Sequence, residues 1–202
     1  ILYEIKDQSL NELLKPEKGD LYIDFEGYPF LTIGRNFEYL YGIWSNDEKN
    51  SFTYYWSDDE EEEKNSFVSF IEKLLEHLEL YPDAKFYHYF SYEISSLRRS
   101  AQNFGVYEKE LEQLIEKKCF IDLFSIVNSS LLIGASSYSL KTVEKLAGIN
   151  RTEDLQSGME SIQYFEDYFF NEEYELKDLI IEYNKADCKN LYLLHDWLAR
   201  LL

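Results

Sequence analysis

Two carboxylates, Asp24 and Glu26, lie two residues apart at the end of an apolar segment. Residues 21–26 alternate apolar and polar side chains and are followed by Gly27, which predicts a strand that ends at this glycine. Residues i and i+2 of a strand point to the same face, so both carboxylates face one way. A carboxylate pair on a buried face is costly unless a cation lies between its members. The pair is therefore a candidate cation site, and a solvated strand end is the alternative.

A further acidic residue lies on a long amphipathic segment near the end of the sequence. Asp187 follows Tyr183 by four residues, so the two share one face of the helix predicted at 175–200. Tyr183 belongs to the apolar stripe of that helix, which carries Asp187 toward the interior. A core tyrosine beside a hydrogen-bonded aspartate is the alternative interpretation of the two residues.

Another acidic residue, Glu93, follows a short strand in the middle of the chain. That strand ends at His88, and a helix begins with Ser91 as its predicted N-cap. Glu93 lies in the first helical turn, where the helix dipole stabilises a carboxylate, so a capping role is its structural alternative. A histidine such as His88 is by itself more often a packed or hydrogen-bonded side chain than a ligand. Asp122 is a competing acidic candidate, which we interpret as a helix-start residue.

An α/β arrangement is expected to carry these residues. Three successive strands with short links, at 21–26, 38–45 and 51–56, indicate an antiparallel meander at the start of a mixed sheet. A fourth strand is predicted at 84–88, after the hydrophobic period has changed to that of helices. Helices are predicted at 59–80, 92–103, 107–117, 120–131, 139–147, 159–170 and 175–200.

Length and composition suit a single buried core. The chain has 202 residues, of which 45% are apolar. We expect a lead-in segment at 1–19, with a helix at about 9–15, and one domain over 20–202. Because the sequence begins with Ile1 rather than Met, we expect it to be excised from a longer protein. Two cysteines without metal-ligand spacing, and the lack of a signal-peptide pattern or membrane-spanning stretch, favour a cytoplasmic protein that does not bind membranes.

The charge argues against a protein that grips nucleic acid by bulk electrostatics. The chain has 39 acidic and 20 basic residues, a formal net charge of −19, whereas such binders carry a basic patch. Six of the negative charges form the run 58–63, which we expect to be a solvated helix start. An acidic protein can still act on nucleic acid if divalent cations and a few local lysines or arginines bind the phosphates.

The motifs, in their order and spacing, resemble the tyrosine variety of the DEDD 3′–5′ exonuclease superfamily, which includes polymerase proofreading domains. In more detail, the chain resembles predicted RNase H-like exonuclease domains that occur beside RecB-type nuclease and helicase modules. The resemblance spans about residues 20–200. It rests on Asp24-Phe25-Glu26-Gly27, Tyr92-Glu93, Ser139-Leu140-Lys141, Tyr183-Asn184-x-x-Asp187 and Trp197-Leu198. One motif departs from the superfamily, which has Asn followed by aromatic-Asp where this chain has His88 and then Tyr92-Glu93.

The resemblance implies an RNase H-like fold and a metal-dependent exonuclease that shortens DNA or RNA from its 3′ end. Two Mg²⁺ or Mn²⁺ ions about 4 Å apart would be bridged by Asp24. Glu26, Glu93 and Asp187 would complete the protein ligands. Tyr183 would orient the attacking water through its hydroxyl group. The implied partners are single-stranded or 3′-ended nucleic acid and, in the full-length protein, flanking nuclease or helicase domains.

Substrate contacts are predicted from fewer residues. Phe25, Tyr28 and Phe30 flank the acidic pair and could stack on a terminal base, while core packing is an equal alternative for Phe25. The polar candidates for substrate contact are His88, Lys141, Arg98 and Arg99. Lys141 is favoured among the basic residues because it lies in one of the strings that resemble the family, and solvated cations are the alternative.

Two other functions compete with the exonuclease. The first is a catalytically degenerate RNase H-like module that binds nucleic acid or a partner domain without cutting, which the net charge and the Glu93 departure favour. The second is an acidic protein-interaction domain unrelated to nucleases. The second predicts that Asp24, Glu26 and Asp187 are solvated and far apart.

Overall fold

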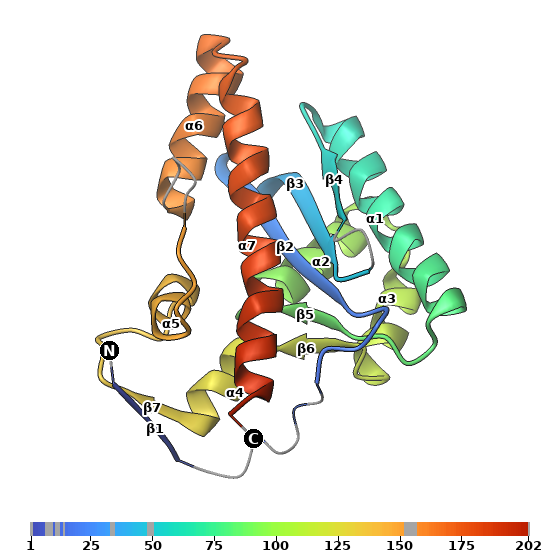
Figure 1. Ribbon diagram of the computed structural model, residues 1–202. Helices are drawn as coiled ribbons and strands as arrows, with labels where there is room; N and C mark the ends of the chain where they lie inside the picture. The colour runs from blue at the N-terminus through green and yellow to red at the C-terminus, as the bar shows by residue number, and fades with distance from the viewer. Residues whose placement is uncertain are drawn as a thin grey trace.

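The computed structural model describes residues 2–6, 10, 13, 15–32, 35–47, 51–151 and 157–201. Their centre is a mixed five-stranded sheet with helices on both faces (Figure 1). The strands, in their order across the sheet, are β4 (Phe52–Trp56), β3 (Arg35–Ser45), β2 (Leu21–Thr32), β5 (Phe86–His88) and β6 (Phe120–Asp122). β2, β3 and β4, which follow one another in the sequence, pair antiparallel, whereas β5 and β6 run parallel to β2. The predicted α/β fold with an antiparallel three-strand start is therefore confirmed.

Seven helices are described. They are α1 (Glu60–Leu80), α2 (Tyr92–Phe104), α3 (Glu108–Glu116), α4 (Leu123–Ser130), α5 (Leu140–Leu146), α6 (Gly158–Asn171) and α7 (Leu176–Ala199). All but α4 lie within one residue of a predicted helix at each end, because each presents an apolar stripe at three- and four-residue spacing. No helix in the described part of the chain is both long and apolar enough to span a membrane.

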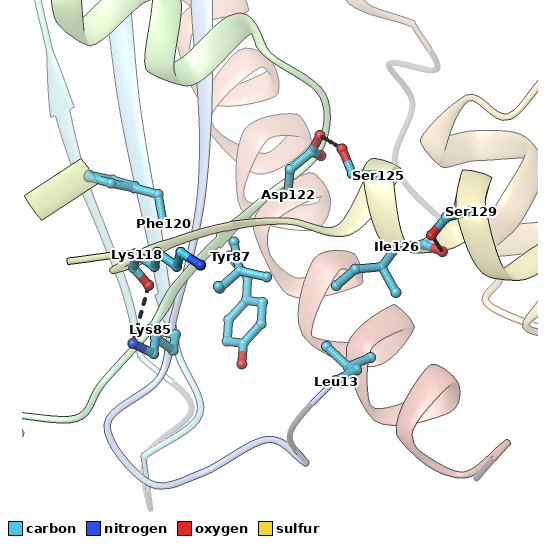
Figure 2. Close-up of a pocket in the computed structure, with 10 residues that line it drawn as sticks. Leu13, Lys85, Tyr87, Lys118, Phe120, Asp122, Ser125, Ile126 and Ser129 are labelled. Carbon is cyan, nitrogen blue, oxygen red and sulfur yellow. Dashed lines mark hydrogen bonds between the residues drawn. The ribbon is translucent and has the colours of Figure 1, made fainter. Parts of the chain in front are cut away.

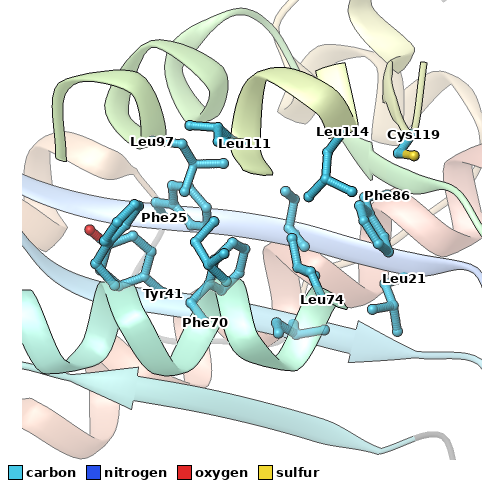
Figure 3. Close-up of a cluster of buried hydrophobic side chains, with 14 of the residues drawn as sticks. Leu21, Phe25, Tyr41, Phe70, Leu74, Phe86, Leu97, Leu111, Leu114 and Cys119 are labelled. Atoms are coloured by element: carbon cyan, nitrogen blue, oxygen red, sulfur yellow. The ribbon is translucent and has the colours of Figure 1, made fainter. Parts of the chain in front are cut away.

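One face of the sheet packs against α1, α2 and α3. Strand alternation directs Leu21, Ile23 and Phe25 to this face, where they join a buried core with Phe70 of α1 and Leu97 of α2 (Figure 3). All five side chains are buried. This core fixes the position of β2. It therefore also fixes the side chains of Asp24 and Glu26, which alternate with these residues and point to the other face.

The other face is covered by α7, which crosses β2 and β3 (Figure 1). Tyr22 points to this side and belongs to a core that includes Leu191 of α7. The helix predicted at 175–200 is confirmed, and its apolar stripe is its buried side. Tyr183 and Asp187 are buried on the same helix, so the predicted path of Asp187 into the interior is also confirmed.

The end of β2 differs from the prediction. The strand does not end at Gly27 but continues to Thr32, with a register shift relative to β3 between Glu26 and Gly27. A Cβ on Gly27 would overlap the hydroxyl group of Tyr92 and the carboxylate of Glu38. The glycine therefore allows close packing across the sheet at a bulge, where we had interpreted it as a strand end.

The helix predicted at 120–131 is wrong at its start, which lies three residues too early. Residues Phe120–Asp122 form the edge strand β6, and the chain leaves the helix at Leu131, which begins the strand β7 (Leu131–Ile133). Such short apolar runs do not distinguish a strand from a buried helix by periodicity. The interpretation of Asp122 as a helix-start residue is confirmed, because its carboxylate accepts the Phe124 backbone N–H at 2.9 Å.

The lead-in segment contains a strand that was not predicted. β1 (Tyr3–Ile5) pairs antiparallel with β7 in a separate two-stranded sheet. Strands of three residues are too short to show a periodic pattern. The helix expected at about 9–15 lies largely outside the described residues.

Candidate functional site

Three carboxylates converge where β2 meets α7. One oxygen from each of Asp24, Glu26 and Asp187 lies within 4.8 Å of the others, and we call these residues the carboxylate cluster. The exposed fraction is only 7% for Glu26 and 6% for Asp187, while Asp24 is half-buried. The interaction-domain hypothesis predicted solvated, separated carboxylates and is therefore wrong.

The electrostatics of the carboxylate cluster favour a bound cation. Burial, followed by the charges of Asp187 and Glu26, raises the pKa of Asp24 well above its usual value. Burial and the charge of Asp187 raise the pKa of Glu26 to about 8. Burial also raises the pKa of Asp187, against the opposing charge of Arg151. Crowded carboxylates are the ligands that hard divalent cations such as Mg²⁺ prefer, so the donor set fits such an ion.

Asn184 orients the first of these carboxylates. Its amide nitrogen donates to Oδ2 of Asp24 at 2.8 Å and to the Asp24 backbone carbonyl at 3.1 Å. Asn184 is fully buried and lies over Gly42, the partner of Asp24 on β3. A Cβ on Gly42 would overlap the Asn184 side chain, so this glycine leaves the room that the amide needs.

Tyr183 and Lys141 form a pair beside the carboxylate cluster. The Lys141 ammonium group donates to the Tyr183 hydroxyl at 2.7 Å and lies 4.5 Å from the centroid of its ring. Burial, followed by the charges of Asp187 and Glu26, raises the pKa of Tyr183 well above its usual value. The phenol is therefore neutral near pH 7, which suits a group that positions a water rather than one that removes its proton.

Arg151 and Glu144 belong to the site but were not found in the sequence. The Arg151 guanidinium contacts Asp187 and donates to both carboxylate oxygens of Glu144, at 2.7 and 2.5 Å. Glu144 also accepts from the amide of Asn190 at 3.1 Å. Arg151 follows α5 in an irregular segment, where no periodicity marks it. The available signal was Glu144, an acidic residue one helical turn after Lys141.

Glu93 lies next to the carboxylate cluster without being part of it. Its Oε2 is 3.4 Å from Nδ1 of His88, and this one oxygen has no closer polar partner within the described residues. Both side chains have an exposed fraction of 3%. The charge of Glu93 nevertheless contributes to the raised pKa of Asp24. The predicted N-cap Ser91 is in place, but its side chain makes no capping hydrogen bond.

His88, the last residue of β5, contacts the loop that follows it and the first turn of α2. Its Nδ1 donates to the backbone carbonyl of Phe90 at 2.7 Å, which leaves Glu93 as a nearby charge. Burial lowers the pKa of His88, but the contact with Glu93 outweighs burial, and the net shift is upward. The ring is buried and lies 3.4 Å from the Glu93 carboxylate, and the predicted substrate contact of His88 stays a prediction.

The aromatic residues predicted to stack on a base differ from one another. Phe25 packs in the core against Tyr41 and Phe70, with ring centroids 4.8 and 5.0 Å away (Figure 3). The core alternative for Phe25 is therefore correct, since alternation directs it away from the face of Asp24 and Glu26. Tyr28 is also buried, against Phe165 of α6, and neither ring is available for stacking. Phe30, in contrast, is 76% exposed.

The remaining basic candidates are paired elsewhere. Arg98 forms an ion pair with Glu112 at 2.7 Å, and Arg99 contacts Glu38 at 3.3 Å. Neither contact involves the carboxylate cluster. A cavity of about 410 Å³ lies beside β5, β6 and α4 (Figure 2). Its lining includes Asp122 and Tyr87 but none of the carboxylate cluster, so we do not assign the cavity to the candidate site.

Comparison with known proteins gives the family. A family model described as the RNase H superfamily matches residues 21–199. Neither the curated proteins nor the solved structures gave a match. The family match covers most of the chain, from the first residue of β2 to the last residue of α7, and therefore contains the whole candidate site. The chain belongs to the RNase H superfamily.

Proposed function

We propose that the chain is a metal-dependent 3′–5′ exonuclease that hydrolyses phosphodiester bonds of DNA or RNA. The observation that carries the proposal is the carboxylate cluster, three acidic side chains within 4.8 Å on β2 and α7. Membership of the RNase H superfamily supports a nuclease. The resemblance to the tyrosine variety of DEDD exonucleases supports the 3′–5′ direction. The likeness to domains beside RecB-type modules supports flanking nuclease or helicase domains as partners of residues 20–202.

The carboxylate cluster would hold divalent cations, Mg²⁺ or Mn²⁺, with Glu93 as the neighbouring fourth carboxylate. When bound, such ions make a water more acidic and stabilise the oxygen that leaves. The chain's own contribution is the position of its ligands. Asn184 holds the Asp24 carboxylate through Oδ2, and the carboxylates of Glu26 and Asp187 are buried beside it.

Tyr183 is the residue that would orient the attacking water. An ammonium group can only donate, so the Tyr183 oxygen accepts from Lys141 and keeps its own proton for a second acceptor. Lys141 therefore fixes the rotation of the hydroxyl group. Its positive charge also lies where the phosphate of a bound nucleotide would approach the carboxylate cluster.

The proposal is tested by following degradation of 5′-labelled single-stranded DNA and RNA with Mn²⁺ or Mg²⁺. Wild type is compared with Asp24→Asn and Asp187→Asn, and Asp196→Asn provides a matched control on the same helix, half-exposed and paired with Arg200. We expect a shortening ladder that needs metal, persists in the control and disappears in the two cluster variants. Folded wild type that cleaves neither substrate would overturn the proposal.

A non-catalytic RNase H-like module is the second candidate. The position of Glu93, which faces His88 and lies outside the carboxylate cluster, favours it, as does the net charge of −19. Under this alternative, wild type binds nucleic acid in the presence of metal but leaves its length unchanged in the same experiment.

A further inference from the structure

Arg151 is a buried cation at the edge of the carboxylate cluster. Its side chain is 8% exposed, and it contacts Asp187 directly. Its guanidinium also lies 5.7 Å from the centroid of the Tyr183 ring. The Lys141 ammonium group contacts the same ring. Arg151 and Lys141 therefore both border the tyrosine and the aspartate that the proposed reaction uses.

One nitrogen of the Arg151 guanidinium, Nη1, donates no hydrogen bond within the described residues. Nε and Nη2 donate to the two oxygens of Glu144, and Nη2 also contacts Asp187. Because the guanidinium is planar, the Nη1–Nη2 edge presents two parallel N–H groups on the side of Asp187. Nη1 is buried and has no hydrogen-bond partner within the described residues. A buried donor without an acceptor is costly, which suits a position that a ligand oxygen completes.

Glu144 fixes the orientation of the Arg151 guanidinium. Glu144 has an exposed fraction of 1% and accepts a further hydrogen bond from Asn190 of α7, which is also buried. The Glu144 carboxylate is therefore attached to both α5 and α7. The Nε–Nη2 edge of Arg151 cannot turn without breaking this paired contact, so the opposite edge keeps its direction.

We propose that Arg151 is a substrate-binding residue that donates to a non-bridging oxygen of the terminal phosphodiester, with Glu144 and Asn190 as positioning residues. The inference rests on the proposed nuclease function and names the group that recognises its substrate. A guanidinium edge matches two phosphate oxygens in geometry and charge. In this structure Asp187 is an acceptor at that edge; an Asp187 carboxylate that held a divalent cation would leave the edge to the phosphate.

The test measures binding rather than cleavage. A 5′-fluorescein-labelled oligothymidylate is titrated in Ca²⁺ by fluorescence anisotropy, with either a normal or an uncharged methylphosphonate group at the last 3′ linkage. The main variant is Glu144→Gln/Arg151→Met, which removes both charges of the Glu144–Arg151 pair; Asp187 loses its guanidinium contact, and the Ca²⁺ in the titration would balance its charge. The matched control is Glu112→Gln/Arg98→Met, which removes an exposed arginine–glutamate pair. A second variant, Arg151→Lys, keeps the positive charge but lacks the paired N–H groups of a guanidinium.

We expect wild type and the control pair to bind the normal probe about 10- to 100-fold more tightly than the methylphosphonate probe. The variant Glu144→Gln/Arg151→Met should bind both probes equally weakly, and Arg151→Lys should fall between. Thermal unfolding confirms that each variant is folded.

The inference is overturned if the double variant discriminates between the probes as well as wild type does. If wild type cleaves the normal probe with Mn²⁺ in that case, only the role of Arg151 fails. If wild type neither cleaves nor binds the normal probe, the proposed function fails and the role of Arg151 with it.

Discussion

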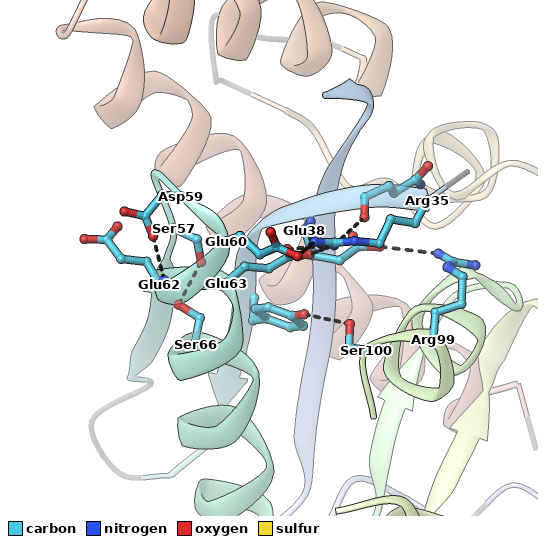
Figure 4. Close-up of polar contacts among 12 residues, drawn as sticks. Arg35, Glu38, Ser57, Asp59, Glu60, Glu62, Glu63, Ser66, Arg99 and Ser100 are labelled. Carbon is cyan, nitrogen blue, oxygen red and sulfur yellow. Dashed lines mark hydrogen bonds and ion pairs between the residues drawn. The ribbon is translucent and has the colours of Figure 1, made fainter. Parts of the chain in front are cut away.

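Glu38 and Glu63 form a second buried acidic cluster, on the sheet face opposite the carboxylate cluster (Figure 4). Arg35 donates to both oxygens of Glu63, at 2.8 and 2.7 Å, and the backbone N–H of Glu38 adds a third bond. Glu38 itself accepts from the Tyr92 hydroxyl and from Arg99. We call these four charged residues, Glu38, Glu63, Arg35 and Arg99, the arginine-paired cluster.

The two clusters differ in whether each carboxylate has an arginine of its own. In the arginine-paired cluster each acid has its own arginine. In the carboxylate cluster the ion pair of Arg151 with Asp187 is shared with Glu144, while Asp24 and Glu26 repel each other across one strand face. Buried acids that each pair with an arginine hold a fold together, whereas crowded acids that outnumber the basic side chains beside them indicate a site for a cation. The predictions below test this distinction.

The largest effect is expected from Asp24→Asn. Removal of one cluster carboxylate should lower the cleavage rate about 1,000-fold or more, because several kcal/mol of metal-assisted stabilisation are lost. The free energy of unfolding without metal should stay equal or rise, since repulsion with Glu26 and Asp187 is relieved. Cleavage rates and urea denaturation in EDTA measure the two quantities. A marked loss of stability would place Asp24 with the structural acids.

The opposite outcome is expected from Arg35→Met in the arginine-paired cluster. Glu63 has an exposed fraction of 0% and would be left as an unpaired buried charge, which costs about 3 kcal/mol. Urea denaturation measures this loss. The double variant Arg35→Met/Glu63→Gln should recover most of it. Cleavage per folded molecule should stay near the wild-type value, and a large loss of cleavage would remove the contrast between the two clusters.

A smaller effect is expected from Gly42→Ala. The new methyl group would displace Asn184, which holds Asp24, and overpacking of this kind costs about 1–3 kcal/mol. The apparent affinity for Mg²⁺, measured by thermal shift, should fall with it. The control Gly105→Ala has open space around its Cβ but a positive φ, so it should lose stability without loss of Mg²⁺ affinity.

The last prediction concerns pH, because the raised pKa of Glu26 makes the stability of the fold depend on whether this carboxyl group is protonated. The pKa of Glu26 is about 8 in the folded chain against 4.5 as its ordinary value, so the folded state holds the extra proton between these limits. Stability without metal should therefore fall as pH rises from about 5 to 8. Urea midpoints in EDTA at both pH values measure the slope. Mg²⁺ and Glu26→Gln should each reduce it, and an unchanged slope in both would contradict the assignment.

The parts of the fold that could be predicted have a clear period. Strand β2 and helix α7 each repeat their apolar residues often enough to place Asp24, Glu26 and Asp187 on facing surfaces. The strand β6 has three residues, too few to separate it from the following helix, so its prediction was wrong. Phe25 shows an avoidable error, because the alternation that aligns Asp24 with Glu26 also directs Phe25 to the opposite face.

Arg151 could not have been predicted in the same way. It lies after α5, outside any periodic segment, and reaches the carboxylate cluster only because α5 packs on α7. Its partner Glu144 is an acid on the buried side of a short helix, which local sequence cannot distinguish from an exposed one. Tertiary packing alone brings such residues together.

The hydrogen bond between Asn184 and Asp24 joins residues 160 positions apart in the sequence. The two sides of the carboxylate cluster come from the first strand of the sheet and from the last helix of the chain. During synthesis β2 leaves the ribosome long before α7 exists, and a chain without α7 therefore lacks one of the three cluster carboxylates. If the cluster is the nuclease site, the growing polypeptide stays harmless to the RNA that surrounds it until α7 has docked on β2.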